Sequence, residues 1–154
     1  MLTAKDIMTV KVITVTPDTP VKTLADILWK HRISGAPVLD ENGDLIGVVT
    51  ENDLIDQTKK LHIPSMISIL DSVIFLESQD KMKNEINKMA GTVVRDICSK
   101  KLVSVEESMP LDEIATIMAE KKVHTLPVVA AGKLVGVIGK SDIIRTLAGG
   151  HFSD

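Results

Sequence analysis

The sequence repeats itself, and this repetition limits the possible folds more than any other feature of the chain. At an offset of 90 residues several positions match: Asp6 with Asp96, Val15 with Val105, Pro20 with Pro110, and Pro37-Val38 with Pro127-Val128. Further along, the matching offset is 89: Gly47-Val48 with Gly136-Val137, and Asp53 with Asp142. A one-residue deletion in a turn explains this slip, because turns tolerate changes of length that strands do not. Two copies predict a pair of units related by a pseudo-twofold axis.

Each copy is expected to fold as strand, helix, strand, strand, helix. The first strand is a short β-branched run, over residues 12–15 in one copy and 102–105 in the other. A helix follows, with Pro20 or Pro110 at its first position, where a missing amide hydrogen costs nothing. Apolar residues then recur at helical spacing and predict one buried face: Val21, Leu24, Ala25 and Leu28 in the first copy, and Leu111, Ile114, Ala115 and Met118 in the second. Trp29 is expected to pack at the end of this face, with a position beside a nucleotide base as the alternative.

A hairpin and a second helix complete each copy. Strands over residues 36–39 and 45–49 flank an Asp-Glu-Asn-Gly turn, and the second copy has one turn residue fewer. The last helix is expected from Glu51 to about residue 60, and from Lys140 to about residue 147. A unit of about fifty residues cannot bury both faces of a three-stranded sheet, so the copies should pack against each other.

The predicted division of the chain is residues 1–60 for the first repeat, 61–91 for a helical insert, and 92–150 for the second repeat. Residues 61–76 have apolar side chains at helical spacing, but this stretch is too short for a membrane span and contains Asp71. It is expected to form a packing or oligomer surface. The fold class is therefore α/β (α+β), with tandem βαββα units and a helical insert between them.

One pattern occurs twice in the same order: a Pro-Val strand, a Gly-hydrophobic-hydrophobic strand, and an Asp at the head of the last helix. This pattern resembles the cystathionine-β-synthase (CBS) domain family, and a tandem pair is similar to a Bateman module. The resemblance covers about residues 2–58 and 92–148. It implies a flat disc with two symmetry-related clefts that bind AMP, ADP, ATP or S-adenosylmethionine, and regulation of an attached or partner protein.

On that resemblance, Asp53 accepts hydrogen bonds from both ribose hydroxyls, because a carboxylate offers two acceptor oxygens to a vicinal diol. Thr50 would offer its hydroxyl, and the start of the helix its amides, to a phosphate or the ribose. The second copy keeps Asp142 but has Gly139 where the family usually shows Thr or Ser. Because of this departure the two sites are not expected to bind a ligand equally, although Lys140 could supply a positive charge for phosphate at the second.

The remaining ligand-binding positions also come from the resemblance. Ile13-Thr14 and Val103-Ser104 match the strand whose backbone reads the adenine edge. Other positions match residues that line the cleft or reach phosphates in relatives: Val48, Val137, Ile33, Ser34, Gly35, Val123, His124 and Thr125.

Thr50 and Asp53 could also have a simpler role. Thr50 and Asp53 have the spacing of a capping box, in which the two side chains bond to orphan amides at a helix start. In the second copy Gly139 has no hydroxyl for such a box, yet Asp142 is present, which favours ligand binding. An Asp in the first turn of a helix is also favoured by the helix dipole, so this argument is a modest one. Capping and ligand binding both remain possible interpretations. Other polar residues are expected to be ordinary: His31, His62 and His151 solvated, and Cys98 a small core residue.

Composition and charge argue against several classes of function. The formal net charge is −3 with both signs interspersed, so no basic stripe is present to bind nucleic acid. No Cys/His cluster has the spacing of a zinc site, and no nucleophile with a base indicates an enzyme. The single Cys98 cannot form an internal disulfide and the N-terminus lacks a secretory signal, so a cytoplasmic location is expected.

The sequence thus predicts a regulatory module whose ligand is an adenine nucleotide (AMP, ADP or ATP), not a catalytic cofactor. It is expected to form a homodimer, to act on an effector protein that the sequence does not identify, and to bind neither nucleic acid nor membrane. Two alternatives stay open: a purely structural dimerisation module without a ligand, and an S-adenosylmethionine binder.

Overall fold

The computed structural model describes residues 1–59, 92–99 and 101–150. The predicted insert of residues 61–91, including His62, lies outside the described residues, and so does His151.

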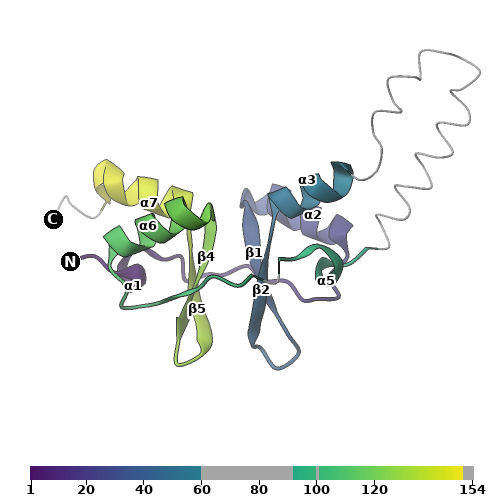
Figure 1. The fold of residues 1–154 in the computed structure, drawn as a ribbon, viewed down its shortest axis with the longest axis horizontal. Coiled ribbons are helices and arrows are strands. Elements are labelled where there is room, and N and C mark those ends of the chain that lie inside the picture. Colours follow the sequence, from purple (N-terminus) through teal and green to yellow (C-terminus); the bar gives the residue numbers. More distant parts are fainter. Residues whose placement is uncertain (60–91, 100, 151–154) are drawn as a thin grey trace, which may run out of the picture.

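The described helices and strands follow the repeat (Figure 1). The first copy contains α1 (Ala4–Ile7), α2 (Val21–His31), β1 (Gly35–Leu39), β2 (Leu45–Thr50) and α3 (Glu51–Lys59). The second contains α5 (Val94–Ile97), β3 (Val105–Glu106), α6 (Leu111–Lys121), β4 (Thr125–Ala130), β5 (Lys133–Gly139), α7 (Lys140–Arg145) and the π-helix η2 (Thr146–Gly150). The mixed α/β class and the paired units confirm the prediction for the fold.

The two hairpins show where the repeat slips. β1 pairs with β2 and β4 with β5, each antiparallel and each with a register shift near the end of the first strand. Leu39 pairs with Leu45, and the matching Val129 pairs with Leu134, so the second hairpin has one residue fewer between the paired positions. In this shorter turn Ala131 and Gly132 both have positive φ, 51° and 78°, as a tight hairpin turn requires. The predicted deletion is confirmed and lies at the tip of the hairpin.

The predicted first strands are much shorter than expected. Only Val15 of residues 12–15 pairs, by a single parallel bridge to Val38, and β3 is confined to Val105–Glu106 instead of residues 102–105. The physical reason lies in the preceding residues: Thr9 bridges to Val137 in the other copy, and Ser99 bridges to Val48. Because the chain must cross from one repeat to the other between these points, it cannot run alongside β1 or β4 for longer.

The long helices are close to the predicted ones. α2 and α6 begin at Val21 and Leu111, one residue after the prolines, which occupy the N-cap position instead of the first helical one. Most of the predicted face is at least half-buried, but Ala115 is exposed. The prediction for Trp29 was wrong: its side chain is 85% exposed, because it lies just beyond Leu28, the last buried residue of α2.

The short first helix of each copy packs into the core of the other copy. Ala4 and Ile7 of α1 are buried with Ile114, Leu126 and Ile138 of the second repeat. In the same way, Val94 of α5 is buried in the first repeat, in the cluster of Val15, Leu24, Leu28, Ala36, Val38 and Val49. The two repeats therefore exchange their first helices, and each core is completed by a segment of the other copy.

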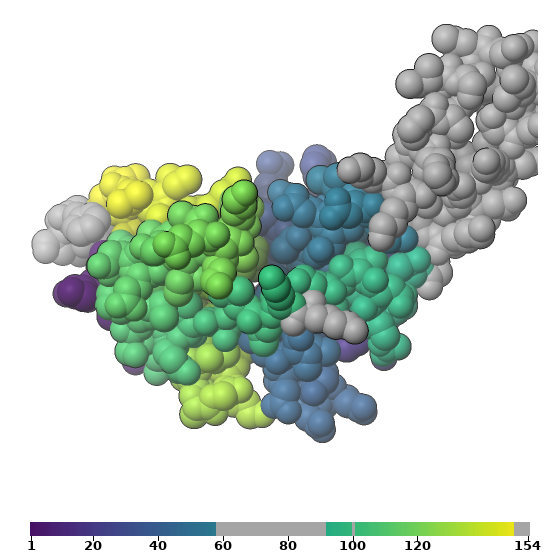
Figure 2. Space-filling model, in the orientation of Figure 1, coloured from purple at the N-terminus to yellow at the C-terminus, as the bar shows by residue number. Residues whose placement is uncertain are grey.

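The two sheets meet through β1 and β4 at the middle of the molecule, and α2, α3, α6 and α7 all lie on one side of it (Figures 1 and 2). Gly35 permits this close approach, because a Cβ at this position would lie 2.7 Å from Thr125 Oγ1 and 3.1 Å from the Val49 carbonyl oxygen. Two clefts open beside this contact, and the predicted residues are found in them.

Candidate functional site

The first cleft, here called the Asp53 cleft, has a volume of about 240 Å³. One wall comes from the end of β2 and the first turn of α3, and the other from the segments that precede β3 and β4 in the second repeat. The predicted residues that line only this cleft are Val48, Thr50, Asp53, Val103, Val123 and His124.

The second cleft, here called the Asp142 cleft, has a volume of about 300 Å³ and the reverse arrangement. β5 and the first turn of α7 face the segments that precede β1. The predicted residues that line only this cleft are Ile13, Ile33, Gly35, Val137, Lys140 and Asp142. Each cleft therefore takes its acidic residue from one repeat and its opposite wall from the other.

Ser34 and Thr125 line both clefts and form part of the wall between them. Their hydroxyl oxygens, Oγ and Oγ1, lie 3.3 Å apart in a hydrogen bond whose donor could be either residue. The two clefts thus share one pair of hydroxyls.

Thr14 and Ser104 are the predicted residues that line neither cleft. Both side chains are exposed, whereas their neighbours Ile13 and Val103 are half-buried and line the clefts. Successive side chains of an extended segment point to opposite sides, so only one of each pair can face a cleft.

Asp53 both caps a helix and keeps an acceptor for other partners. Its Oδ2 accepts hydrogen bonds from the Thr50 amide (2.8 Å) and the Thr50 hydroxyl (3.2 Å). The first bond satisfies the amide that precedes α3, as the capping interpretation predicted for Asp53, whereas in the second bond the Thr50 hydroxyl donates to the carboxylate. Its Oδ1 accepts no hydrogen bond from the described residues. Capping and ligand binding are therefore compatible, because each can use a different oxygen.

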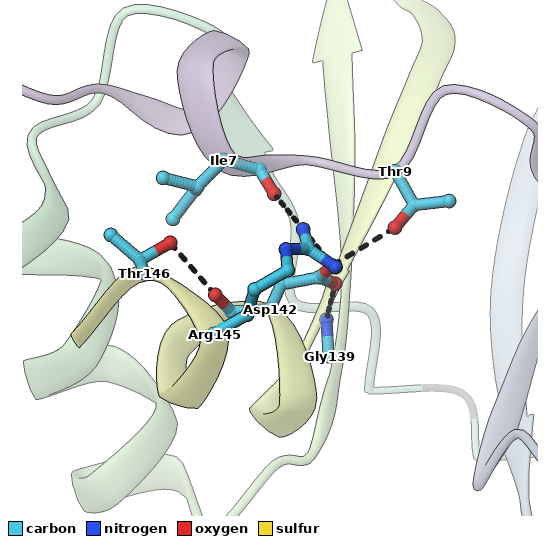
Figure 3. Close-up of polar contacts among 6 residues, drawn as sticks. All are labelled: Ile7, Thr9, Gly139, Asp142, Arg145 and Thr146. Atoms are coloured by element: carbon cyan, nitrogen blue, oxygen red, sulfur yellow. Dashed lines mark hydrogen bonds and ion pairs between the residues drawn. The ribbon is translucent and has the colours of Figure 1, made fainter. Parts of the chain in front are cut away.

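Asp142 is engaged through both of its oxygens (Figure 3). Oδ2 accepts a hydrogen bond from the Gly139 amide (2.7 Å), and Oδ1 accepts bonds from Thr9 Oγ1 (2.9 Å) and Arg145 Nη2 (2.8 Å). Arg145 Nη2 also reaches the Ile7 carbonyl oxygen at 3.4 Å. The Asp142 side chain is 7% exposed, so the exchanged N-terminal segment and α7 together enclose it.

The sequence predicted Lys140 of the Asp142 cleft, but the other cationic residues of the two clefts were missed. Lys101 and Lys122 line the Asp53 cleft, and Lys11 and Arg32 line the Asp142 cleft. A signal was present, because both pairs are related by the same offset of 90 residues as the rest of the repeat. Arg32 and Lys122 also follow the ends of α2 and α6 with φ of 53° and 54°, so helix termination fixes their backbone beside the clefts.

Of the other polar residues considered in the sequence, the structure describes His31 and Cys98, and both lie outside the two clefts. His31 is exposed and lines neither cleft, and Cys98 is half-buried against the core of the first repeat. Within the described ranges, no three His, Cys, Asp or Glu side chains are grouped so that they could hold a metal ion. No helix in the described part of the chain has both the length and the apolar character needed to cross a membrane.

Comparison with known proteins gives consistent matches over both repeats. Residues 4–59 and 94–149 each match the family model of the CBS domain. The uncharacterized protein MJ1426 of Methanocaldococcus jannaschii is 29% identical to this chain, over 93% of this chain and 89% of that protein. The chloroplastic CBS domain-containing protein CBSX2 of Arabidopsis thaliana is 33% identical over 85% of this chain, which spans 56% of that protein. A crystal structure of CBSX2 in complex with AMP is similar with a TM-score of 0.71 and 28% identity, over 96% of this chain and 97% of that one.

Proposed function

The chain belongs to the CBS domain family, of which it carries two copies, and we propose that it is a regulatory module that binds AMP or another adenine nucleotide in the Asp53 cleft. One observation carries this proposal: the cleft between the repeats is lined by a carboxylate that has an oxygen available and by cationic residues on the opposite wall. These are the groups that recognise the two polar ends of a nucleotide.

The Asp53 cleft offers a partner for each part of a nucleotide. Asp53 Oδ1 would accept from the ribose hydroxyls, and such charge-assisted hydrogen bonds are stronger than neutral ones. Lys101 and Lys122 would neutralise the phosphate, and His124 would donate a hydrogen bond to it. Val48, Val103 and Val123 are half-buried in the same cleft and would enclose the adenine ring.

The AMP complex of CBSX2 also supports this proposal, because that structure shares the fold at 28% identity.

We further propose that the module is regulatory, acting on an effector protein, and not an enzyme. We also propose that residues 1–60 form the first repeat, residues 61–91 a helical insert and residues 92–150 the second repeat. A cytoplasmic location is retained as well, because a chain with one cysteine forms no internal disulfide and suits a reducing compartment.

Nucleotide binding should raise the thermal stability of the full chain. AMP at one hundred times its Kd is expected to add about 2.7 kcal/mol, because only the folded state binds. For a chain of this size, that corresponds to a rise in Tm of roughly 6 to 10 °C. Differential scanning calorimetry with AMP, ADP and ATP measures this shift, with guanosine monophosphate as the control for base recognition. A shift with S-adenosylmethionine alone would favour the methyl-donor alternative, and no shift with any of them would favour the structural one.

We also propose that two copies associate through the side of the molecule that carries α2, α3, α6 and α7 (Figure 1). Large apolar side chains are exposed on these helices and on η2: Trp29 at 85%, Ile55 at 61%, Ile144 at 62% and Leu147 at 67%. The homodimer prediction rested on residues 61–76, which lie outside the described residues, and on the flat disc that the resemblance implies, so this surface is a further and separate argument. Large apolar side chains exposed on one side of a protein indicate an interaction surface.

Light scattering of the full chain should give twice the monomer mass of 16.7 kDa. Trp29→Glu is expected to yield a monomer, because a charge would be desolvated in the contact. Ile46→Glu is the matched control, since Ile46 is 43% exposed on β2, away from the helices. Trp29 is the only tryptophan, so burial in the dimer should also shift its fluorescence to shorter wavelength on concentration. A monomeric wild-type chain at micromolar concentration would refute the dimer.

A further inference from the structure

The two acidic residues hold matching positions in the repeats, yet only one of them is available to a ligand. Asp142 already accepts three hydrogen bonds, from Thr9, Gly139 and Arg145. Asp53 accepts only from Thr50 among the described residues, through a single oxygen. A ribose that approached Asp142 would compete with bonds that are already formed at a side chain only 7% exposed, so its net gain would be small.

Charges of opposite sign at two matching positions make the repeats differ further. Arg145, which pairs with Asp142, has Asp56 at the matching position of the first repeat. Lys140, which lines the Asp142 cleft, has Glu51 at the matching position in the Asp53 cleft. Glu51 lines the Asp53 cleft and Asp56 does not, so the first difference adds charge to the Asp142 cleft alone and the second changes the charge of both clefts.

The charges that line each cleft differ accordingly. The Asp142 cleft has four cationic side chains, Lys11, Arg32, Lys140 and Arg145, and one acidic one, an excess of three positive charges. In the Asp53 cleft, two lysines are balanced by two carboxylates when His124 is neutral. Like charges gathered in one cleft repel each other and raise the local potential, and an anion relieves that repulsion.

Most of the positive charge in the Asp142 cleft has no ion-pair partner among the residues that the structure describes. Of its four cations, only Arg145 forms an ion pair with a described residue. The side chains of Lys11, Arg32 and Lys140 are exposed and are available to a ligand. They come from separate segments, before β1 and at the start of α7, so the fold itself brings them to one cleft.

We propose that the Asp142 cleft binds the phosphate chain of a polyanion through Lys11, Arg32 and Lys140, and that Asp142 takes no part in holding a ribose. The ligand class is a chain of several linked phosphates, either on a nucleoside triphosphate or as free inorganic polyphosphate. The volume of about 300 Å³ lies at the lower end of the usual range for ligand pockets, which suits a phosphate chain. This inference rests on the proposed function, in which the other cleft holds the ribose.

Inorganic tripolyphosphate, which carries no nucleoside, is the probe that isolates this site. Isothermal titration calorimetry of the full chain should detect its binding, and rising salt should weaken it. Lys140→Glu, which introduces the charge found at the matching position, is expected to weaken binding by about tenfold or more. Lys22→Glu makes the same change of charge at an exposed position on α2 that lines neither cleft, and should have little effect.

Competition experiments identify the source of the phosphates. ATP should displace tripolyphosphate more effectively than AMP, and adenosine should not displace it. ATP binding that is tighter than tripolyphosphate binding favours a nucleoside triphosphate, and equal or weaker binding favours an inorganic chain. Displacement by AMP as effective as by ATP would overturn the preference for a phosphate chain.

The AMP titration of the same wild-type sample separates two kinds of failure. AMP binding without tripolyphosphate binding at millimolar concentration would overturn this inference alone. Tripolyphosphate binding without AMP binding would overturn the proposed function instead. Equal weakening in Lys140→Glu and Lys22→Glu would show that net charge alone is responsible, and would also overturn the site.

Discussion

Asp53→Asn is expected to bind AMP about 10- to 150-fold more weakly than the wild-type chain, since hydrogen bonds to a charged group contribute about 1.5–3 kcal/mol. The side chain keeps its size, but Asn has a single acceptor oxygen and no charge. That oxygen can accept from the Thr50 amide, as Asp53 Oδ2 does at 2.8 Å, or from a ligand hydroxyl, but not fully from both. Calorimetric titration with AMP measures the change.

Asp56→Asn is the matched control for this variant. Asp56 lies one turn further along α3, is exposed, and does not line the Asp53 cleft. The change of charge and of side-chain type is identical, so AMP affinity should change by less than about threefold, as for an exposed charge. Comparable losses in the two variants would mean that Asp53 acts only through net charge. An unchanged affinity in Asp53→Asn would remove the ribose acceptor from the proposed function.

Ile7→Ala is expected to lower the free energy of unfolding by about 2–5 kcal/mol, as for other large buried aliphatic residues. Ile7 is 1% exposed and packs in the core of the second repeat, although it lies in the first helix of the chain. Its removal would leave a cavity beside Ile114, Leu126 and Ile138. Urea unfolding followed by circular dichroism gives the change in free energy.

Lys5→Ala, on the same short helix, serves as the comparison. The Lys5 side chain is exposed, so its truncation should change stability by less than about 0.5 kcal/mol. Val94→Ala tests the reciprocal contact, because Val94 is fully buried in the first repeat. If Ile7→Ala were as mild as Lys5→Ala, the exchange of first helices would not contribute to the folded state in solution.

Much of the fold could be predicted because the same pattern of apolar and turn residues occurs twice in the sequence. The 3.6-residue spacing of Val21, Leu24 and Leu28 and the turn residues around Gly43 are local signals, and their counterparts in the second copy repeat them. The shared offset also predicted the position of the deleted turn residue. Most of the predicted site residues line one of the two clefts for the same reason.

The exchange of α1 and α5 could not be predicted from local patterns. Each of these helices has four residues, and two apolar positions such as Ala4 and Ile7 are too few to reveal a period. The hydrogen bonds of Asp142 could not be predicted for a related reason. Its partner Thr9 lies 133 residues away in the sequence, and no spacing rule connects them. Arg145 was visible three residues further on, but its effect depends on how Asp142 is enclosed.

The crossing of the first helices has a consequence for the order in which the protein can mature during its synthesis. The residues of α1 are made before their partners in β4 and β5, which follow more than a hundred residues later. The first half in turn waits for Val94 before its own interior is closed. The first half can therefore close once α5 has emerged, whereas the core of the second half closes last, when β5 has been made and α1 can pack against it.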